Sequence, residues 1–179
     1  EIFAEKIIYN KKQATIKTEG KSTYADNGGN KLYADSFYYD INLKTIDAKN
    51  NVKYVDKEGN LLNFTSLKYY EETEKGSGKN LRATLIDKST LEGAEAEFDN
   101  KLGTLTLLRE NNYTPCENKK NSSKTIRELC PDWSISTTET MHDKNEKMVY
   151  HKNAILKIKN IPVFYTPYFS HPDPSVKRK

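Results

Sequence analysis

Residues 31–41 read KLYADSFYYDI, and this stretch alternates between two faces in the manner of a β-strand. Period-two alternation in a run rich in aromatic residues indicates an extended strand with one buried face. The alternation assigns one face to Leu32, Ala34, Ser36 and Tyr38, and the other to Tyr33, Asp35, Phe37, Tyr39 and Ile41. We therefore expect a strand here and a fold dominated by such strands.

The same pattern recurs in the sequence at a shift of 30 residues. Ala4–Asn10 (AEKIIYN) matches Ala34–Asp40 (ADSFYYD), and the shift also aligns Ile16 with Ile46 and Gly20 with Asn50. A third, blurred copy at 65–71 keeps the aromatic and acidic end. A repeated unit of two strands and a turn buries little by itself and must stack on its neighbours. Chance self-similarity of an all-β chain remains the alternative at this point.

Other alternating runs fill most of the chain and are separated by turn signals. The runs are 2–9, 51–55, 61–70, 81–86, 94–98, 104–108, 134–140 and 147–158. The turn signals are 27–30, 57–60, 76–78, 99–101 and 143–145. Short strands separated by regularly spaced turns, with no long amphipathic helix, predict an all-β sandwich, barrel or solenoid.

The composition indicates one folded domain with a polar surface. The chain has 179 residues, of which 30% are charged, yet it also has 12 Tyr and 6 Phe, which a disordered chain lacks. The formal net charge is only +4, and 25 of the 29 cations are Lys. Specific readout of bases and phosphates favours Arg, so we expect no nucleic-acid partner.

No run approaches the roughly 18 to 20 apolar residues of a membrane-spanning helix. The longest apolar run, 161–169, contains Pro162 and Pro167, which remove backbone donors. We expect these prolines to stop strand pairing, so that 161–179 forms a linker after a domain at 1–160. A start at Glu1 and a polar end indicate a piece of a longer precursor.

Few residues suggest metal or catalytic chemistry. Cys116 and Cys130 flank a polar loop and suit a disulfide in an oxidising compartment, or a metal ligand or nucleophile elsewhere. His142, His151 and His171 are far apart in sequence, so we expect isolated surface histidines. We expect no metal site and no cofactor.

Beyond these patterns, the chain resembles the LptD (organic-solvent-tolerance) family of lipopolysaccharide-assembly outer-membrane proteins. Its C-terminal third contains several motifs in the order of that family. They are Tyr113-Thr114-Pro115-Cys116, Trp133 followed by Ser134-Ile135-Ser136, His142-Asp143, Asn153-Ala154, Ile161–Phe169 and His171–Lys179. The repeat at 4–10 and 34–40 is a weaker part of the same resemblance.

The resemblance implies a periplasmic β-jellyroll, with two facing sheets of stacked strand pairs around an apolar interior. In the family, this domain accepts lipopolysaccharide from a periplasmic bridge protein of the LptA kind and shields its acyl chains. It then passes the lipid to its own C-terminal outer-membrane barrel, which a plug lipoprotein of the LptE kind accompanies. This is transport on the periplasmic side of the outer membrane, without catalysis or cofactor.

The resemblance and the alternation together indicate candidate residues for lipid contact and for the junction with the barrel. Inward candidates for lipid contact are Ile7, Tyr9, Phe37, Tyr39, Phe64, Phe98, Leu105 and Leu107. Candidates for the barrel junction and lipid exit are Pro162, Phe164, Tyr165, Pro167, Tyr168 and Phe169. The strand at 2–9 is the expected docking edge for the bridge. In the family, a cysteine at the position of Cys116 pairs with the barrel; here we favour a local bridge to Cys130.

Two other functional classes compete with lipid transport. Catalysis needs converging carboxylates or an activated nucleophile, and no sequence motif selects such a set. A secreted carbohydrate-binding or adhesin-type module is the stronger rival, because exposed Tyr and Asn suit sugar stacking and hydrogen bonding. Such a module would bind free sugar and ignore acyl chains.

Overall fold

The computed structural model describes residues 1–25, 28–86, 88–115, 132–173 and 176. Within these ranges the regular structure is entirely β-strand. The strands are β1 (Ile2–Asn10), β2 (Thr15–Ala25), β3 (Lys31–Ala34), β4 (Ser36–Asp40), β5 (Thr45–Val55), β6 (Leu61–Tyr70), β7 (Lys75–Thr84), β8 (Thr90–Asp99), β9 (Thr104–Thr114), β10 (Trp133–Asp143), β11 (Met148–Ile158) and β12 (Ile161–Pro172). The all-β expectation is confirmed.

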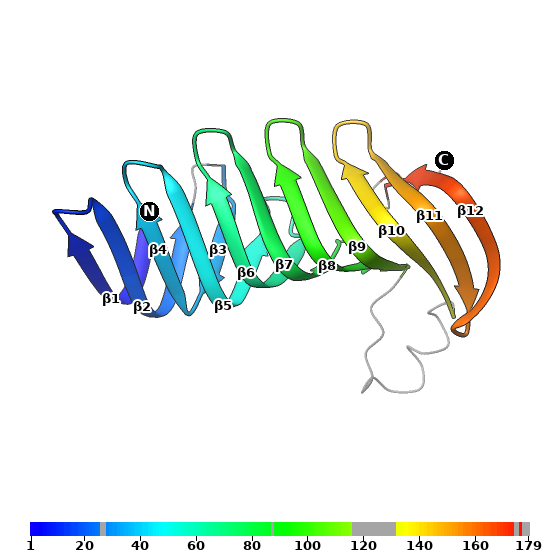
Figure 1. Cartoon of the computed structure of the whole chain (residues 1–179), viewed down its shortest axis with the longest axis horizontal. Coiled ribbons are helices and arrows are strands. Elements are labelled where there is room, and N and C mark those ends of the chain that lie inside the picture. Colours follow the sequence, from blue (N-terminus) through cyan, green and yellow to red (C-terminus); the bar gives the residue numbers. More distant parts are fainter. Residues whose placement is uncertain (26–27, 87, 116–131, 174–175, 177–179) are drawn as a thin grey trace.

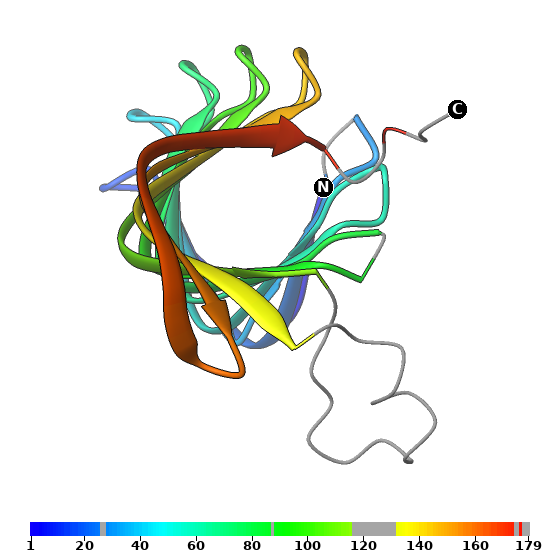
Figure 2. The ribbon, with the colours of Figure 1, turned by 90° about the vertical axis from the view of Figure 1, so that its right-hand side faces the viewer.

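The twelve strands form one antiparallel sheet in sequence order, with β3 and β4 together filling the place between β2 and β5. Figure 1 shows the hairpins side by side along the long axis of the molecule. Viewed along that axis, the sheet is rolled round a common interior (Figure 2). The expected two facing sheets are therefore two arms of a single bent sheet.

The strands pass from one arm to the other through bends at mid-strand. At the bends, backbone φ is positive at Gly20, Asn50, Asn51, Asn80, Arg109, Glu110 and Asn153. Gly and Asn tolerate this left-handed conformation best. Gly20, Asn50, Asn80 and Glu110 follow one another at intervals of 30 residues. The backbone thus confirms the repeat inferred from the sequence.

The bends also reverse which residues point inward. Leu32, Ala34 and Phe37 are all buried, because the break at Asp35 between β3 and β4 shifts the alternation by one residue. The two faces inferred for 31–41 were therefore wrong beyond Asp35. The same reversal separates Phe64 from Leu67 in β6, both of which are buried.

Successive hairpin turns stack on one another and form one rim of the rolled sheet. Asp40 ends β4, and its Oδ1 accepts the backbone amides of Asn42 and Leu43 at 3.0 and 2.9 Å. Ile41 N donates to Ala14 O of the preceding turn (3.0 Å), and Glu71 N donates to Lys44 O (2.9 Å). We call the five turns 10–14, 40–44, 70–74, 99–103 and 143–147 the turn rim. The described loop residues 28–30, 56–60, 85–86 and 88–89, at the other ends of the strands, form the loop rim.

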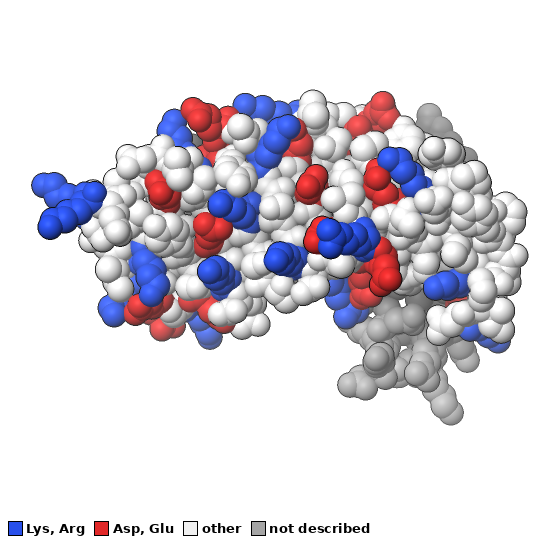
Figure 3. All heavy atoms as spheres, in the orientation of Figure 1, with Lys and Arg blue, Asp and Glu red and all other residues white. Residues whose placement is uncertain are grey.

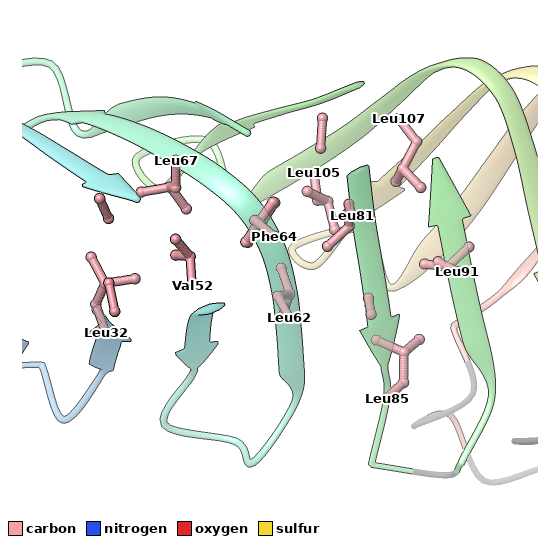
Figure 4. Packing of buried hydrophobic residues seen from close by; sticks show 14 of the residues in the cluster. Leu32, Val52, Leu62, Phe64, Leu67, Leu81, Leu85, Leu91, Leu105 and Leu107 are labelled. Carbon is pink, nitrogen blue, oxygen red and sulfur yellow. The ribbon is translucent and has the colours of Figure 1, made fainter. Parts of the chain in front are cut away.

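The core fills the space between the arms with aliphatic and aromatic side chains (Figure 4). Gly76 and Gly78 lie within β7 and not in the turn expected at 76–78. A Cβ at Gly76 would overlap the ring of Phe98, and one at Gly78 would overlap the ring of Phe64. These glycines make room for inward aromatic rings, so they serve packing and not chain reversal.

β1 and β12 are the two edges of the sheet. β12 pairs with β11 from Met148↔Pro172 to Ile158↔Ile161, so the expectation that Pro162 and Pro167 stop strand pairing was wrong. Proline is tolerated on an edge strand, because its nitrogen, which has no hydrogen to donate, can lie on the side of the strand that faces solvent. Over the face seen in Figure 3, cationic and anionic side chains are interspersed. In the part of the chain that the structure describes, no helix is long and apolar enough to cross a membrane.

Candidate functional site

The interior opens between the two rims into a cavity of about 680 Å³. This volume lies within the range of roughly 300 to 1,000 Å³ typical of ligand sites. One part of its wall is apolar and aromatic, and it consists of Tyr54, Leu62, Phe64, Leu67, Tyr69, Leu85, Phe98 and Leu105. Its mouth is polar, because both rims contribute charged and amide side chains. An apolar wall beneath a polar mouth suits an amphiphile.

Alternation within each arm places the apolar wall. Tyr69, Gly76, Phe98 and Leu105 are cross-strand neighbours on β6, β7, β8 and β9 and form one inward row. The rings of Tyr69 and Phe98 stack across Gly76 with centroids 6.0 Å apart and an interplanar angle of 13°. This stack forms a flat aromatic surface in the cavity wall.

Lys144 of the turn rim crosses the mouth and pairs with two acids of the loop rim. Its Nζ donates to Asp56 Oδ2 at 2.8 Å and to Glu58 Oε2 at 3.2 Å. The Asp56 side chain is only 4% exposed, whereas that of Lys144 is 40% exposed. Asp56 also accepts hydrogen bonds from the backbone amide and side-chain amide of Asn60, both at 2.8 Å. The loop therefore holds Asp56 in place, while Lys144 reaches across.

The electrostatics of this crossing favour the ionised pair. Burial acts to raise the pKa of Asp56, but hydrogen bonds from Lys144 and Asn60 outweigh it and hold this pKa below its ordinary value. Burial likewise acts to lower the pKa of Lys144, but its bonds to Asp56 and Glu58 outweigh burial and raise this pKa. Both partners thus remain charged over the neutral range.

Glu71 makes a second, weaker link between the rims. Its carboxylate accepts a hydrogen bond from Tyr39 Oη at 2.8 Å and a long one from Tyr24 Oη at 3.5 Å. Tyr24 lies at the loop-rim end of β2, and Glu71 lies in a turn of the other rim. Burial, followed by the bond to Glu71, raises the pKa of Tyr39, so this hydroxyl remains a donor at neutral pH.

At the β10–β12 end, ring side chains span the interior from arm to arm. Tyr113 of one arm lies 5.1 Å from His171 and 6.1 Å from His151 of the other, between ring centroids. His151 stacks on Phe169, and Tyr113 also contacts Trp133. The expectation of isolated surface histidines was therefore wrong, because the register of β11 and β12 brings His151 beside His171.

A chain of hydrogen bonds runs through this ring cluster. Thr137 and Thr140 share a hydroxyl contact of 2.8 Å, Thr140 Oγ1 lies 3.0 Å from His151 Nδ1, and His151 Nε2 lies 3.1 Å from His171 Nε2. Burial, followed by the charge of His171, lowers the pKa of His151 from 6.5 to about 4. His151 is therefore neutral at pH 7. His142, also buried, pairs with Asp173.

The inward candidates from the sequence fall into three groups. Phe64, Phe98 and Leu105 line the cavity. Phe37 and Leu107 are fully buried in the core, and Tyr39 packs against it. Ile7 and Tyr9 lie opposite Thr18 and Ile16 but are 52% and 58% exposed, because β1 is an edge strand.

The junction candidates all lie on β12. Phe164, Tyr165, Tyr168 and Phe169 are exposed, with Tyr168 at 75%. Pro162 and Pro167 are exposed as well. The candidate disulfide residues Cys116 and Cys130 lie outside the described residues.

Sequence reasoning missed the residues that link the arms: Lys144, Asp56, Tyr113, His151 and His171. Their contacts join segments up to 88 residues apart. A pattern of neighbouring residues in the sequence does not predict contacts over such a separation. Among the residues with described positions, no group of three or more His, Cys, Asp or Glu is placed to hold a metal ion.

Sequence comparison finds no matching family model. The LPS-assembly protein LptD of Yersinia pseudotuberculosis serotype I (strain IP32953) is 33% identical over 104 residues, which cover 54% of this chain and 12% of that protein. The LPS-assembly protein LptD of Francisella tularensis subsp. novicida (strain U112) is 48% identical over 40 residues, covering 22% of this chain and 5% of that protein. The resemblance to LptD is thus confirmed, and the chain spans about an eighth of the length of the Yersinia relative.

Among solved structures, the chain is similar to LptH of Pseudomonas aeruginosa, described as the LptA homologous periplasmic component of the lipopolysaccharide transport device. The TM-score is 0.49 at 14% sequence identity, and the match covers 55% of this chain and 74% of LptH.

Proposed function

We propose that this chain, which is similar to part of the LPS-assembly protein LptD, conducts lipopolysaccharide toward the outer membrane. The acyl chains lie against the apolar wall of the cavity, and the sugars remain at the polar mouth. The observation that carries the proposal is the continuous inward row of apolar and aromatic residues beneath a charged rim. The matches to LptD proteins support it.

The energetics suit transfer without chemistry. Each acyl methylene moved from water to an apolar wall gains about 0.8 kcal/mol, so long chains prefer the groove to water by a wide margin. Release therefore requires a push from outside the domain, as a stream of lipid from a bridge would supply. The role is non-catalytic and needs no cofactor.

The N-terminal edge is the entry side in this proposal. β1 leaves one side unpaired and exposes Phe3, Ile7 and Tyr9. Unpaired strand edges accept a partner strand by β-augmentation. An LptA-like bridge protein that pairs with β1 would extend the inward rows, because Ile7 and Tyr9 continue them beyond Thr18 and Ile16.

The C-terminal edge is the exit side. The exposed aromatic residues of β12 suit a membrane interface, where amphipathic rings are favoured. In this proposal β12 leads to the protein's own barrel, accompanied by an LptE-like lipoprotein, on the periplasmic side of the outer membrane. Pro162, Phe164, Tyr165, Pro167, Tyr168 and Phe169 form the junction.

Binding of intact lipopolysaccharide, compared with its deacylated carbohydrate, tests the function. Titration of the purified chain should show binding that requires the acyl chains. Leu105→Gln places an amide in the cavity wall and should weaken binding about tenfold or more. Thr106→Gln, on the opposite face of β9, should not. Equal binding of the deacylated carbohydrate would contradict the proposal and favour a sugar-binding module.

The bridge contact has a separate test. A photo-crosslinking residue at Tyr9 should capture an LptA-like protein, whereas one at Tyr165 on the other edge should not. Capture from Tyr165 alone would reverse the proposed direction.

A further inference from the structure

The mouth of the groove is held closed by side chains and not by main-chain pairing. The turn rim and the loop rim belong to opposite arms of the sheet, and β1 and β12, the edges of the sheet, do not pair with each other. Where the cavity lies, Lys144 joins the two rims through its contacts with Asp56 and Glu58. Side-chain contacts at the rims, together with the core between the arms, therefore hold the rims at their distance.

The two sides of this contact differ in rigidity. Asp56 is fixed by bonds from Asn60 within its own loop, and Asp56 Oδ1 also accepts the amide of Glu58 at 3.1 Å. Lys144 instead reaches over with a flexible four-carbon stem that is 40% exposed. Lys144 is thus the partner that can dissociate from Asp56 and Glu58, and water can then solvate its ammonium group.

The closed groove is small for a lipid with several chains. A cavity of about 680 Å³ has the size of a site for one drug-sized ligand. Protein interiors are close-packed, so the wall offers little spare volume beyond that cavity. The rims must therefore separate before several acyl chains can lie side by side between the arms.

We propose that Lys144, Asp56 and Glu58 form a clasp that sets the width of the groove and so determines which amphiphiles it admits. With the clasp closed, the groove takes a single hydrocarbon chain. With the clasp open, it takes an amphiphile with several chains. The width-setting role stands on the rim geometry alone, and the selectivity rests on the proposed lipid-binding function.

The clasp is also expected to respond to salt. Ion pairs that are partly exposed weaken as ionic strength rises, because mobile ions screen them. High salt should therefore widen the groove in the wild-type chain and have little effect once Lys144 is replaced.

The first test measures the rims without any ligand. Spin labels at positions 57 and 146 report the distance between the loop rim and the turn rim, in a chain with Cys116 and Cys130 replaced by Ser. Lys144→Met should lengthen and broaden the distance distribution, and Lys144→Arg should keep it near wild type. Lys152→Met is the matched control, because it breaks the 2.7 Å ion pair with Glu139 on neighbouring strands. An unchanged distance in Lys144→Met would overturn the clasp.

The second test measures selectivity by association rates. Lys144→Met should take up lipopolysaccharide about threefold to tenfold faster, the range expected for loss of a partly buried ion pair. Its rate for myristate, a single-chain probe, should stay within about twofold of wild type. Equal changes for both lipids would overturn the selectivity. Failure of every variant to bind lipopolysaccharide would overturn the proposed function, while the rim distances would still decide the width-setting role.

Discussion

Gly76 lies directly beneath the ring of Phe98, so that a side chain at Gly76 would occupy the space of the ring. The two residues are cross-strand neighbours on β7 and β8. Phe98 in turn forms the flat wall of the cavity with Tyr69. The small residue on one strand therefore determines the shape of the groove on the next.

Gly76→Ala should destabilise the chain by about 1 to 3 kcal/mol, because overpacking forces neighbouring side chains off their preferred positions. Chemical denaturation would measure this change. Ser77→Ala, on the exposed face of the same strand, is the control and should lie within about 0.5 kcal/mol of wild type. Phe98→Leu should restore part of the loss in the double variant; additive losses would contradict the overlap.

The turn rim depends on side chains that cap successive turns. Asp40→Ala removes the acceptor for the amides of Asn42 and Leu43 and should cost about 1 kcal/mol of unfolding free energy. Asp40→Asn keeps the acceptor oxygen and should retain most of the stability. Thermal unfolding of the two variants would compare them, and equal losses would show that the negative charge matters more than the turn geometry.

Stability should fall as pH drops from about 6.5 to 4, in part because of His151. Its pKa is lowered in the folded chain from 6.5 to about 4, so the unfolded chain takes up the proton first. The stability from neutral His151 is fully present above pH 6.5 and is lost as pH falls through this window. The loss approaches roughly 3 kcal/mol, because each pKa unit corresponds to about 1.4 kcal/mol.

Denaturation series of wild type and His151→Phe at several pH values would isolate this contribution, since other titrating groups are common to both. The unfolding free energy of wild type minus that of His151→Phe should fall by up to roughly 3 kcal/mol as pH falls from 6.5 to 4. Only wild type loses the stability of a neutral His151. A constant difference across this window would show that His151 does not titrate as proposed.

The repeat and the alternation were enough to predict the all-β fold. Ala4–Asn10 and Ala34–Asp40 reveal the two-strand unit, and their closing Asn10 and Asp40 mark the turns. The bends were not predicted, because a reversal of alternation at Asp35 depends on how two arms enclose one core. The prediction that Pro162 and Pro167 end strand pairing was wrong for a similar reason. Whether a proline breaks a strand depends on whether that strand lies at the solvent-facing edge of the sheet.

The candidate site was predicted in part. Phe64, Phe98 and Leu105 follow from the alternation of their own strands, which is a local property. Lys144 and Asp56 do not, because a long charged side chain that reaches across a groove has the same sequence signature as any surface lysine. The cluster of His151 and His171 was hidden for the same reason, since the register of β11 and β12 alone brings the two rings together.

Photo-crosslinking to lipopolysaccharide from two adjacent positions on β6 tests whether the lipid passes through the interior of the rolled sheet. Phe64 is buried and lines the cavity, whereas Thr65 is exposed on the opposite side of the strand. A photoreactive phenylalanine analogue at position 64 should crosslink to intact lipopolysaccharide, and excess deacylated carbohydrate should not suppress the product. The same analogue at position 65 should give little or none. Equal crosslinking from both positions, or crosslinking from position 65 alone, would contradict a lipid path through the interior.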